Sequence, residues 1–118
     1  MPATPPIPHP LPDPLIDLIA HRFRCLGEPM RIKLLDALRD GEATVQELQQ
    51  ATGSSQQNVS KHLGVLLDAG MVARVKRGTS SVYSIADDGV FELCEQVCGG
   101  LRRQLRDLDE ILAGGTSR

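Results

Sequence analysis

Uncharged polar side chains and one lysine fill most of residues 54–62, and none of these residues is acidic. Amides, hydroxyls and an ammonium group can hydrogen-bond the edges of nucleic-acid bases and the oxygens of phosphates. They stand at the start of a predicted helix, where the positive end of the helix dipole favours a phosphate. Gln57 and Asn58 are candidates for base edges, and Ser55, Ser60 and Lys61 for phosphates. The candidates that the side-chain chemistry of this segment selects are Ser54, Ser55, Gln56, Gln57, Asn58, Ser60 and Lys61.

A second polar group surrounds a predicted turn and includes Lys76, Arg77 and Thr79. Residues 54–86 hold four basic side chains against one acidic side chain, a net charge of +3, whereas the whole chain has a net charge of −2. A basic segment between acidic flanks indicates a local surface for a polyanion. A hairpin tip with these side chains can contact a DNA backbone or enter a minor groove.

The reactive side chains of this sequence include three cysteines, Cys25, Cys94 and Cys98. Cys94 and Cys98 are four residues apart in a predicted helix, so they share one face. Two thiolates at this spacing can bind one soft metal ion, and they can also be oxidised. Alternatively, each cysteine is a small buried apolar side chain. The spacing alone leaves both interpretations open.

Other chemistries do not fit the spacing of the candidate groups. Ser60 and His62 are two residues apart on a helix, so they face different sides and cannot form a nucleophile pair. Cys94 and Cys98 lack the Cys-x-x-Cys spacing of a redox enzyme. Gly99-Gly100 lacks the strand and helix context of a phosphate loop, so we expect either a helix break there or close approach of a partner backbone. We therefore predict no enzymatic activity.

Four helices that would position the polar groups are predicted between residues 14 and 69. Capping residues, prolines and glycines bound them at residues 14–25, 29–40, 45–51 and 55–69. Thr44 and Glu47 form a capping box before the third helix. Asp13 and Ser54 are the expected N-caps of the first and fourth helices. Seven of the eight prolines lie within residues 1–14, and residues 1–13 are predicted to be a disordered arm.

The pattern changes after residue 70. Residues 71–76 and 81–85 are short and β-prone, with turn residues between them, and they predict a hairpin. A last helix is predicted over residues 88–112, followed by a flexible tail at 114–118, so that 14–113 forms one domain. Apolar residues recur every three or four positions along this helix: Val90, Cys94, Val97, Leu101, Leu105, Leu108 and Leu112.

Length and composition limit the class of protein. A chain of 118 residues is the size of one domain, and its 3% aromatic content requires an aliphatic core. No apolar run approaches the ~18–20 residues of a membrane span, and no basic and apolar start indicates a secretory signal. An odd number of cysteines without a disulfide framework favours a reducing compartment. We therefore expect a cytoplasmic protein with no membrane segment.

Three segments resemble those of one known family. Residues 26–32, LGEPMRI, are similar to its opening motif LxDPxRxxIL, and residues 54–70, SSQQNVSKHLGVLLDAG, to its recognition helix SQSTVSxHLxxLxxAGLV. Residues 77–85 resemble its wing, which ends in VYYxL. The family is the arsenical-resistance-repressor (ArsR/SmtB) group, and the resemblance covers residues 20–112. It implies a small homodimeric repressor that releases DNA on binding a metal ion or another signal. It also implies that His62 contacts the DNA backbone or the helix junction.

Both of the family's best-known metal sites are missing. The thiolate motif ELCVCDL falls on residues 43–48, ATVQEL, which contain no cysteine, and the last helix has no histidine for the zinc site. The family's packing of the first helix on the last would bring Cys25 to Cys94 and Cys98. Three thiolates without histidine would suit a thiophilic metal such as As(III), Hg(II) or Cu(I) better than Ni(II) or Co(II). Oxidation of the thiols is the other candidate signal.

The apolar stripe of the last helix is too long for a small core to cover, which predicts a two-fold interface shared with the first helix. The expected interface residues are Leu15, Ile19, Val97, Leu101, Leu105 and Leu108.

The predicted fold is mainly α with a small β-hairpin: a winged helix-turn-helix of order α-α-α-α-β-β-α that dimerises through its first and last helices. A further short strand before the third helix is also compatible with the sequence. The predicted function is a homodimeric regulator of transcription that binds an imperfect palindromic operator in double-stranded DNA, as a repressor released by an effector. The alternatives are a winged-helix protein-interaction module without an effector site, and a repressor that needs no effector.

Overall fold

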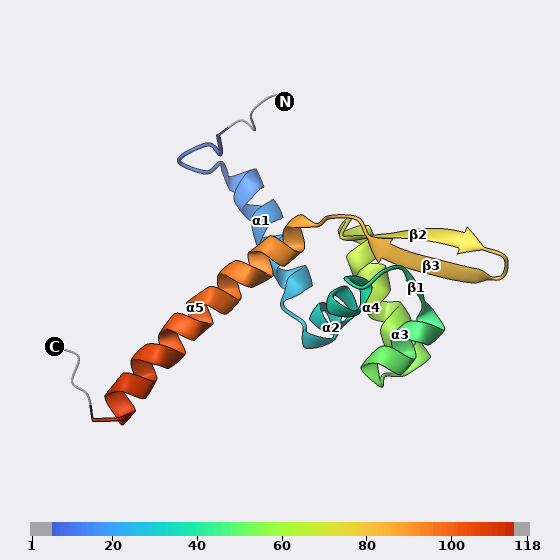
Figure 1. Cartoon of the computed structure of the whole chain (residues 1–118). Helices are drawn as coiled ribbons and strands as arrows, with labels where there is room; N and C mark the ends of the chain where they lie inside the picture. The colour runs from blue at the N-terminus through green and yellow to red at the C-terminus, as the bar shows by residue number, and fades with distance from the viewer. Residues whose placement is uncertain (1–5, 115–118) are drawn as a thin grey trace. The chain divides into compact units, whose positions relative to one another are not determined.

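The structure, a computed structural model, describes residues 6–114, so the parts of the predicted arm and tail at residues 1–5 and 115–118 lie outside the described residues. The elements follow the order α-α-β-α-α-β-β-α (Figure 1). The chain divides into two compact units, one ending at Ala86 and the other beginning at Asp87. The first unit is a winged helix-turn-helix, as predicted, and it includes the short strand before the third helix that the sequence allowed.

The first two helices are α1 (Asp13–Leu26) and α2 (Pro29–Leu38). The predicted cap of α1 is wrong: the N-cap is Pro12, which makes no side-chain hydrogen bond, and Asp13 lies in the first turn beside Pro14. A carboxylate in the first turn still favours the helix through its dipole. At α2 the Glu28 carboxylate accepts from the Met30 backbone N–H at 2.8 Å, which satisfies one of the unpaired donors of the helix.

The helix-turn-helix consists of α3 (Val45–Thr52) and α4 (Gln56–Asp68). Gly53 ends α3 at φ +72°, a left-handed conformation that glycine adopts without a steric penalty and that turns the chain sharply. The predicted cap of α4 is one residue too early. Ser55, not Ser54, is the N-cap, and its hydroxyl accepts from the Asn58 backbone N–H at 3.1 Å.

Three antiparallel strands form a sheet of order β1-β3-β2: β1 (Ala43–Thr44), β2 (Val72–Arg77) and β3 (Ser80–Ile85). The β2–β3 pair is the predicted hairpin, and its register runs from Val72 opposite Ile85 to Arg77 opposite Ser80. Gly78, at φ +63°, closes the turn. β1 pairs Ala43 with Tyr83, which ties the start of α3 to the wing. Two residues are too few to produce a strand pattern in the sequence.

The core of the first unit is aliphatic, as the low aromatic content requires. Helices α2, α3 and α4 contact one another, and α4 also contacts β2. Burying these side chains supplies most of the favourable free energy of folding. The core consists of Leu34, Leu35, Leu38, Leu48, Val59, Leu63, Leu66, Met71, Val72, Val82 and Tyr83.

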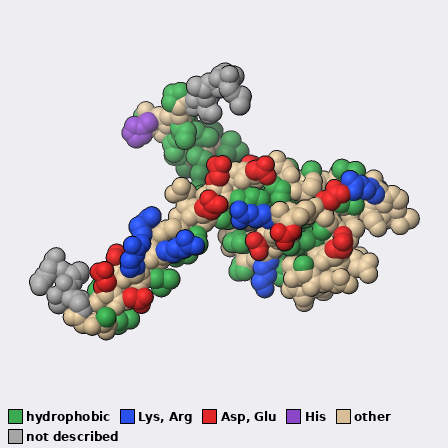
Figure 2. All heavy atoms as spheres, in the orientation of Figure 1, with side chains coloured by type: hydrophobic (Ala, Val, Ile, Leu, Met, Phe, Trp, Pro, Cys, Tyr) green, Lys and Arg blue, Asp and Glu red, His purple; other side chains and the backbone are tan. Residues whose placement is uncertain are grey.

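The second unit contains α5 (Gly89–Leu112), a helix of 24 residues. It runs without interruption through Gly99 and Gly100, so the expected helix break is wrong. Figure 2 shows hydrophobic side chains exposed on this helix beside its arginine side chains. Across residues 6–114, no helix is both long enough and apolar enough to cross a membrane.

Candidate nucleic-acid interface

The start of α4 exposes the polar residues that the sequence selected. Ser55, Gln56, Gln57, Ser60 and Lys61 are all exposed. The opposite face of the helix is packed in the core, because Val59, Leu63 and Leu66 have no solvent exposure. An amphipathic helix packed on one side presents the other side as a rigid surface. This surface can be inserted into a major groove without rearrangement of the fold.

Three members of the candidate set, Ser54, Ser55 and Asn58, form hydrogen bonds within the protein. The Asn58 side-chain N–H donates to the Ser54 hydroxyl at 2.7 Å, and the Ser55 hydroxyl caps the helix. Both serine oxygens therefore hold the turn before α4 in place. The carbonyl oxygen of the Asn58 side chain is not used in these bonds and can still accept from a base.

His62 lies at the helix junction and is only 7% exposed. Its Nδ1 is 3.1 Å from Nη1 of Arg31, whose Nε donates to the Cys25 carbonyl at 2.6 Å and whose Nη2 donates to the Arg24 carbonyl at 3.2 Å. Because a guanidinium only donates, His62 Nδ1 accepts, and the ring proton of the neutral imidazole is on Nε2. Arg31 thus joins the end of α1 to the middle of α4. Of the two roles implied for His62, the structure supports the helix junction, and its burial argues against direct DNA contact.

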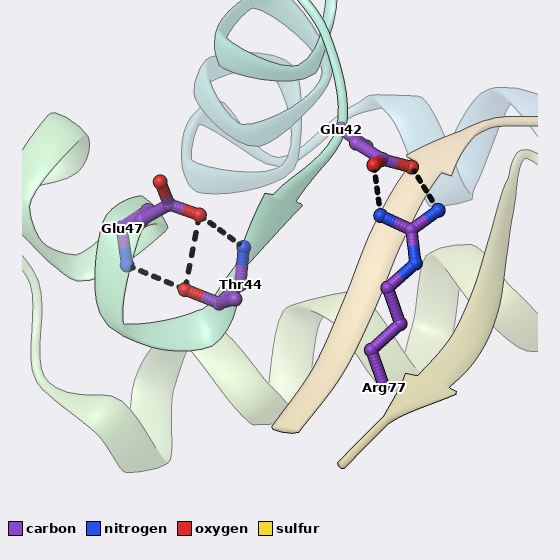
Figure 3. Close-up of polar contacts among 4 residues, drawn as sticks. All are labelled: Glu42, Thr44, Glu47 and Arg77. Atoms are coloured by element: carbon purple, nitrogen blue, oxygen red, sulfur yellow. Dashed lines mark hydrogen bonds and ion pairs between the residues drawn. The ribbon is translucent and has the colours of Figure 1, made fainter. Parts of the chain in front are cut away.

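The tip of the wing exposes Lys76, Arg77 and Thr79. Arg77 is not free, since both of its terminal nitrogens bond the carboxylate of Glu42 (Figure 3). Glu42 is 35 residues away in the chain, so no local pattern in the sequence could have revealed this pair.

A groove of about 510 Å³ lies between the start of α3, the start of α4 and the wing tip. It connects the two surfaces that the sequence identified separately. Gln46 and Gln49 were not predicted as site residues, although their spacing of three places them on one face of α3. The lining is almost entirely uncharged and polar: Thr44, Val45, Gln46, Gln49, Gln56, Thr79, Ser80 and Ser81.

Comparisons with known proteins agree with this geometry. Residues 26–75 match a family described as a helix-turn-helix domain. The chain is 36% identical over 110 residues to the uncharacterized HTH-type transcriptional regulator Rv0081 of Mycobacterium tuberculosis, a match that spans 89% of this chain and 96% of that protein. The crystal structure of Rv0081 superposes with a TM-score of 0.73 at 37% identity, covering 81% of this chain and 97% of that chain.

Two further relatives are informative. A solution structure of the homodimeric winged helix-turn-helix DNA-binding domain of Mb0332 from Mycobacterium bovis, a possible ArsR-family transcriptional regulator, matches with a TM-score of 0.70 at 28% identity over 85% of this chain and 95% of that one. The chain belongs to the ArsR/SmtB family. It is also 40% identical over 77 residues, 65% of its length, to 62% of a probable mercury resistance operon repressor of Streptomyces lividans.

Members of the ArsR/SmtB family are DNA-binding regulators of transcription rather than enzymes, and this chain is such a regulator. Family membership explains why the polar start of α4, the groove and the wing occur together in one unit. It does not identify an effector site.

The three cysteines of this ArsR/SmtB chain are divided between the units. Cys25 is buried in the first unit, with its Sγ 3.6 Å from Nε2 of His21. Cys94 and Cys98 are exposed on α5 in the single protomer. Within neither unit do the described residues bring together three or more His, Cys, Asp or Glu side chains in a metal-binding group. Binding of one metal by all three thiols stays a prediction.

The predicted dimer residues are largely uncovered. Leu15 is half-buried and Ile19 is exposed on α1. On α5 the exposed fraction is 59% for Leu105, and Val97, Leu101 and Leu108 are similar. Apolar side chains repeated along one helix face at this exposure are characteristic of an interaction surface.

Arg31→Gln is expected to destabilise the protein by about 1–3 kcal/mol, because it removes three hydrogen bonds and leaves buried His62 without its donor. Urea unfolding measures this change. Lys33→Gln is the matched control, since it removes the same charge from an exposed position on the same helix. Equal stability of the two variants would contradict a junction role for Arg31.

Proposed function

We propose that this ArsR/SmtB protein is a homodimeric repressor that binds an imperfect palindromic operator in the cytoplasm and is released by an effector. The observation that carries the proposal is the single surface formed by the exposed polar start of α4, the groove beside it and the wing tip. Each of these contributes hydrogen-bonding side chains. Glu42 is an acidic residue on this surface, and it is paired with Arg77.

The start of α4 enters the major groove in this proposal. Gln57 is exposed in the first turn of α4. Its side-chain amide can donate one hydrogen bond to a base edge and accept another from it at the same time. Asn58 offers its remaining carbonyl oxygen to a second base. Ser60 and Lys61 contact phosphates, and the wing tip contacts the backbone beside the same half-site.

Dimerisation uses the apolar residues of α1 and α5. A two-fold dimer presents two copies of α4, so the operator has two half-sites about one helical turn apart, or a small multiple of it. The homodimeric state of the Mb0332 domain supports this arrangement. The long apolar stripe of α5 supplies exposed side chains for it, among them Val97, Leu101 and Leu105.

Cys94 and Cys98 are the proposed effector site. Both thiols are free and exposed, and they share a face of α5. Thiolates prefer soft ions, and the Streptomyces lividans relative is named for mercury resistance. A thiophilic metal such as Hg(II), As(III) or Cu(I), or an oxidant, would change the helix that also carries the dimer surface. A coupling of ~1–3 kcal/mol between the two sites is enough for a useful switch.

Gln57→Ala is expected to lower operator affinity by about 1–3 kcal/mol and to relax discrimination at one operator position, since it removes a base contact. Lys61→Ala is the comparison: it should weaken binding to all sequences alike and reduce the salt dependence by about one unit. Gel shifts with single-base operator variants at several salt concentrations measure both. If neither variant alters binding, α4 is not the recognition helix.

Leu105→Glu is expected to dissociate the dimer and to lower operator affinity at the same time, because a charge would be buried in an apolar interface. Sedimentation equilibrium and a gel shift on the same sample test this. Gln104→Glu is the matched control, since it adds the same side chain at the neighbouring exposed position outside the stripe. A wild-type protein that stays monomeric at micromolar concentration would contradict the proposal.

The Cys94→Ser, Cys98→Ser double variant should bind operator normally and no longer release it when Hg(II) or a thiol oxidant is added. Fluorescence anisotropy of a labelled operator measures the release. Cys25→Ser, tested alone, shows whether the buried thiol takes part. Unchanged release by the triple variant would place the sensor elsewhere.

A further inference from the structure

The ion pair between Arg77 and Glu42 joins the wing to the body of the first unit. Nη1 of Arg77 bonds Oε1 of Glu42, and Nη2 lies 3.2 Å from Oε2, so the contact is bidentate (Figure 3). Both side chains remain accessible, with 59% of Arg77 and 47% of Glu42 exposed. Lys61 and Lys76 have no acidic partner among residues 6–114. Arg77 therefore differs from both lysines of the basic segment.

We propose that Glu42 competes with a DNA phosphate for Arg77, and so limits the affinity of the wing for DNA of any sequence. This inference rests on the proposed function. It assigns to Glu42 the role of limiting the sequence-independent part of the affinity. Weakening the sequence-independent contact raises the share of the binding energy that depends on the bases read by α4.

The chemistry of the two ligands makes the competition direct. A carboxylate and a phosphate each offer two oxygens that match the planar fork of a guanidinium. While Arg77 holds Glu42, the N–H groups that face the carboxylate are unavailable to a phosphate. Exposed ion pairs contribute little to stability, so Arg77 can exchange partners at small cost.

The fold holds Glu42 in this position. The next two residues form β1, whose Ala43 and Thr44 pair with Tyr83 and Val82 of the wing. The Thr44 backbone N–H donates to the Glu47 carboxylate at 2.9 Å, and the Glu47 backbone N–H donates to the Thr44 hydroxyl at 3.2 Å (Figure 3). The strand pairing of Ala43 and Thr44, together with the capping box of Thr44 and Glu47, therefore fixes the backbone next to Glu42. Of the two carboxylates in this region, Glu47 is used by its helix and only Glu42 reaches the wing.

The salt dependence of DNA binding distinguishes this competition from a general effect of charge. A phosphate contact by a free arginine releases about 0.9 counterion. An arginine that first has to leave a carboxylate behaves differently, because salt also weakens the arginine–carboxylate pair. Weakening this pair favours DNA binding, so it offsets part of the loss of affinity that salt causes at the phosphate contact. Removing the Glu42 charge should therefore steepen the dependence of the binding constant on salt.

The test compares Glu42→Gln, Arg77→Gln and the double variant. Binding is measured by fluorescence anisotropy, with a duplex from the protein's own promoter region and a scrambled duplex of equal length, over a series of salt concentrations. Glu42→Gln should bind both duplexes up to about fivefold more tightly, the factor expected for an exposed ion pair. Its logarithmic salt slope should be steeper by up to about 0.9. In the Arg77→Gln background, the same substitution should have no effect.

Asp40→Asn is the matched control, because it removes one negative charge at an exposed position two residues from Glu42. Equal tightening by Asp40→Asn, or tightening by Glu42→Gln that persists without Arg77, would mean a general charge effect and would overturn the proposal. Weaker binding by Glu42→Gln would overturn it as well, since Glu42 would then orient Arg77 for DNA. If Arg77→Gln lowers affinity and Glu42→Gln changes nothing, only the competition fails. A wild-type protein that binds neither duplex would contradict the proposed function itself.

Discussion

Burial of one face of α4 determines which side chains of that helix are exposed to solvent. Val59, Leu63 and Leu66 recur at helical spacing and are completely buried against the neighbouring elements. Rotating the helix by one residue would expose these three side chains and bury polar ones, at a cost of several kcal/mol. The polar start of the helix is therefore outside because the apolar residues are inside. The burial of apolar side chains that stabilises the unit therefore also determines which residues form the candidate DNA surface.

Burial of the apolar face sets the rotation of α4 about its axis. Polar contacts then fix the position of α4 along that axis and its distance from the neighbouring elements. Gly53 turns the chain before α4, Ser55 caps the helix, and Arg31 of α2 donates to His62 in the middle of it. The Arg31 guanidinium also donates to the Cys25 and Arg24 carbonyls at the end of α1, and the Arg24 carbonyl accepts from the Gly27 backbone N–H as well. A single arginine thus satisfies a helix terminus and a buried imidazole together, and this links a helix of the proposed dimer surface to the recognition helix.

Local rules predicted the parts of the structure that depend on neighbouring residues. The capping box at Thr44, the glycine turn at Gly53 and the hairpin follow from spacings of a few residues. Two adjacent serines can each cap a helix, so the sequence did not distinguish Ser54 from Ser55. The Gly99-Gly100 break failed because about 1 kcal/mol for each glycine is too little to interrupt a helix of 24 residues.

Contacts between distant residues were beyond sequence reasoning. The Arg77–Glu42 pair spans 35 residues and the Arg31–His62 pair spans 31, and neither leaves a periodic signal. The resemblance to a family left two roles open for His62, and the burial of its ring together with its bond to Arg31 favours the helix junction.

The charge distribution explains why two-fold symmetry matters for the proposed function. One protomer has four basic side chains in residues 54–86, and one of them is held by Glu42. So few phosphate contacts give weak binding at physiological salt. Joining two protomers makes the second half-site contact intramolecular and multiplies the affinity without any new contact. That gain vanishes when the two copies of α4 no longer match the half-site spacing. In the proposed function, a small change at the dimer surface would therefore release the operator.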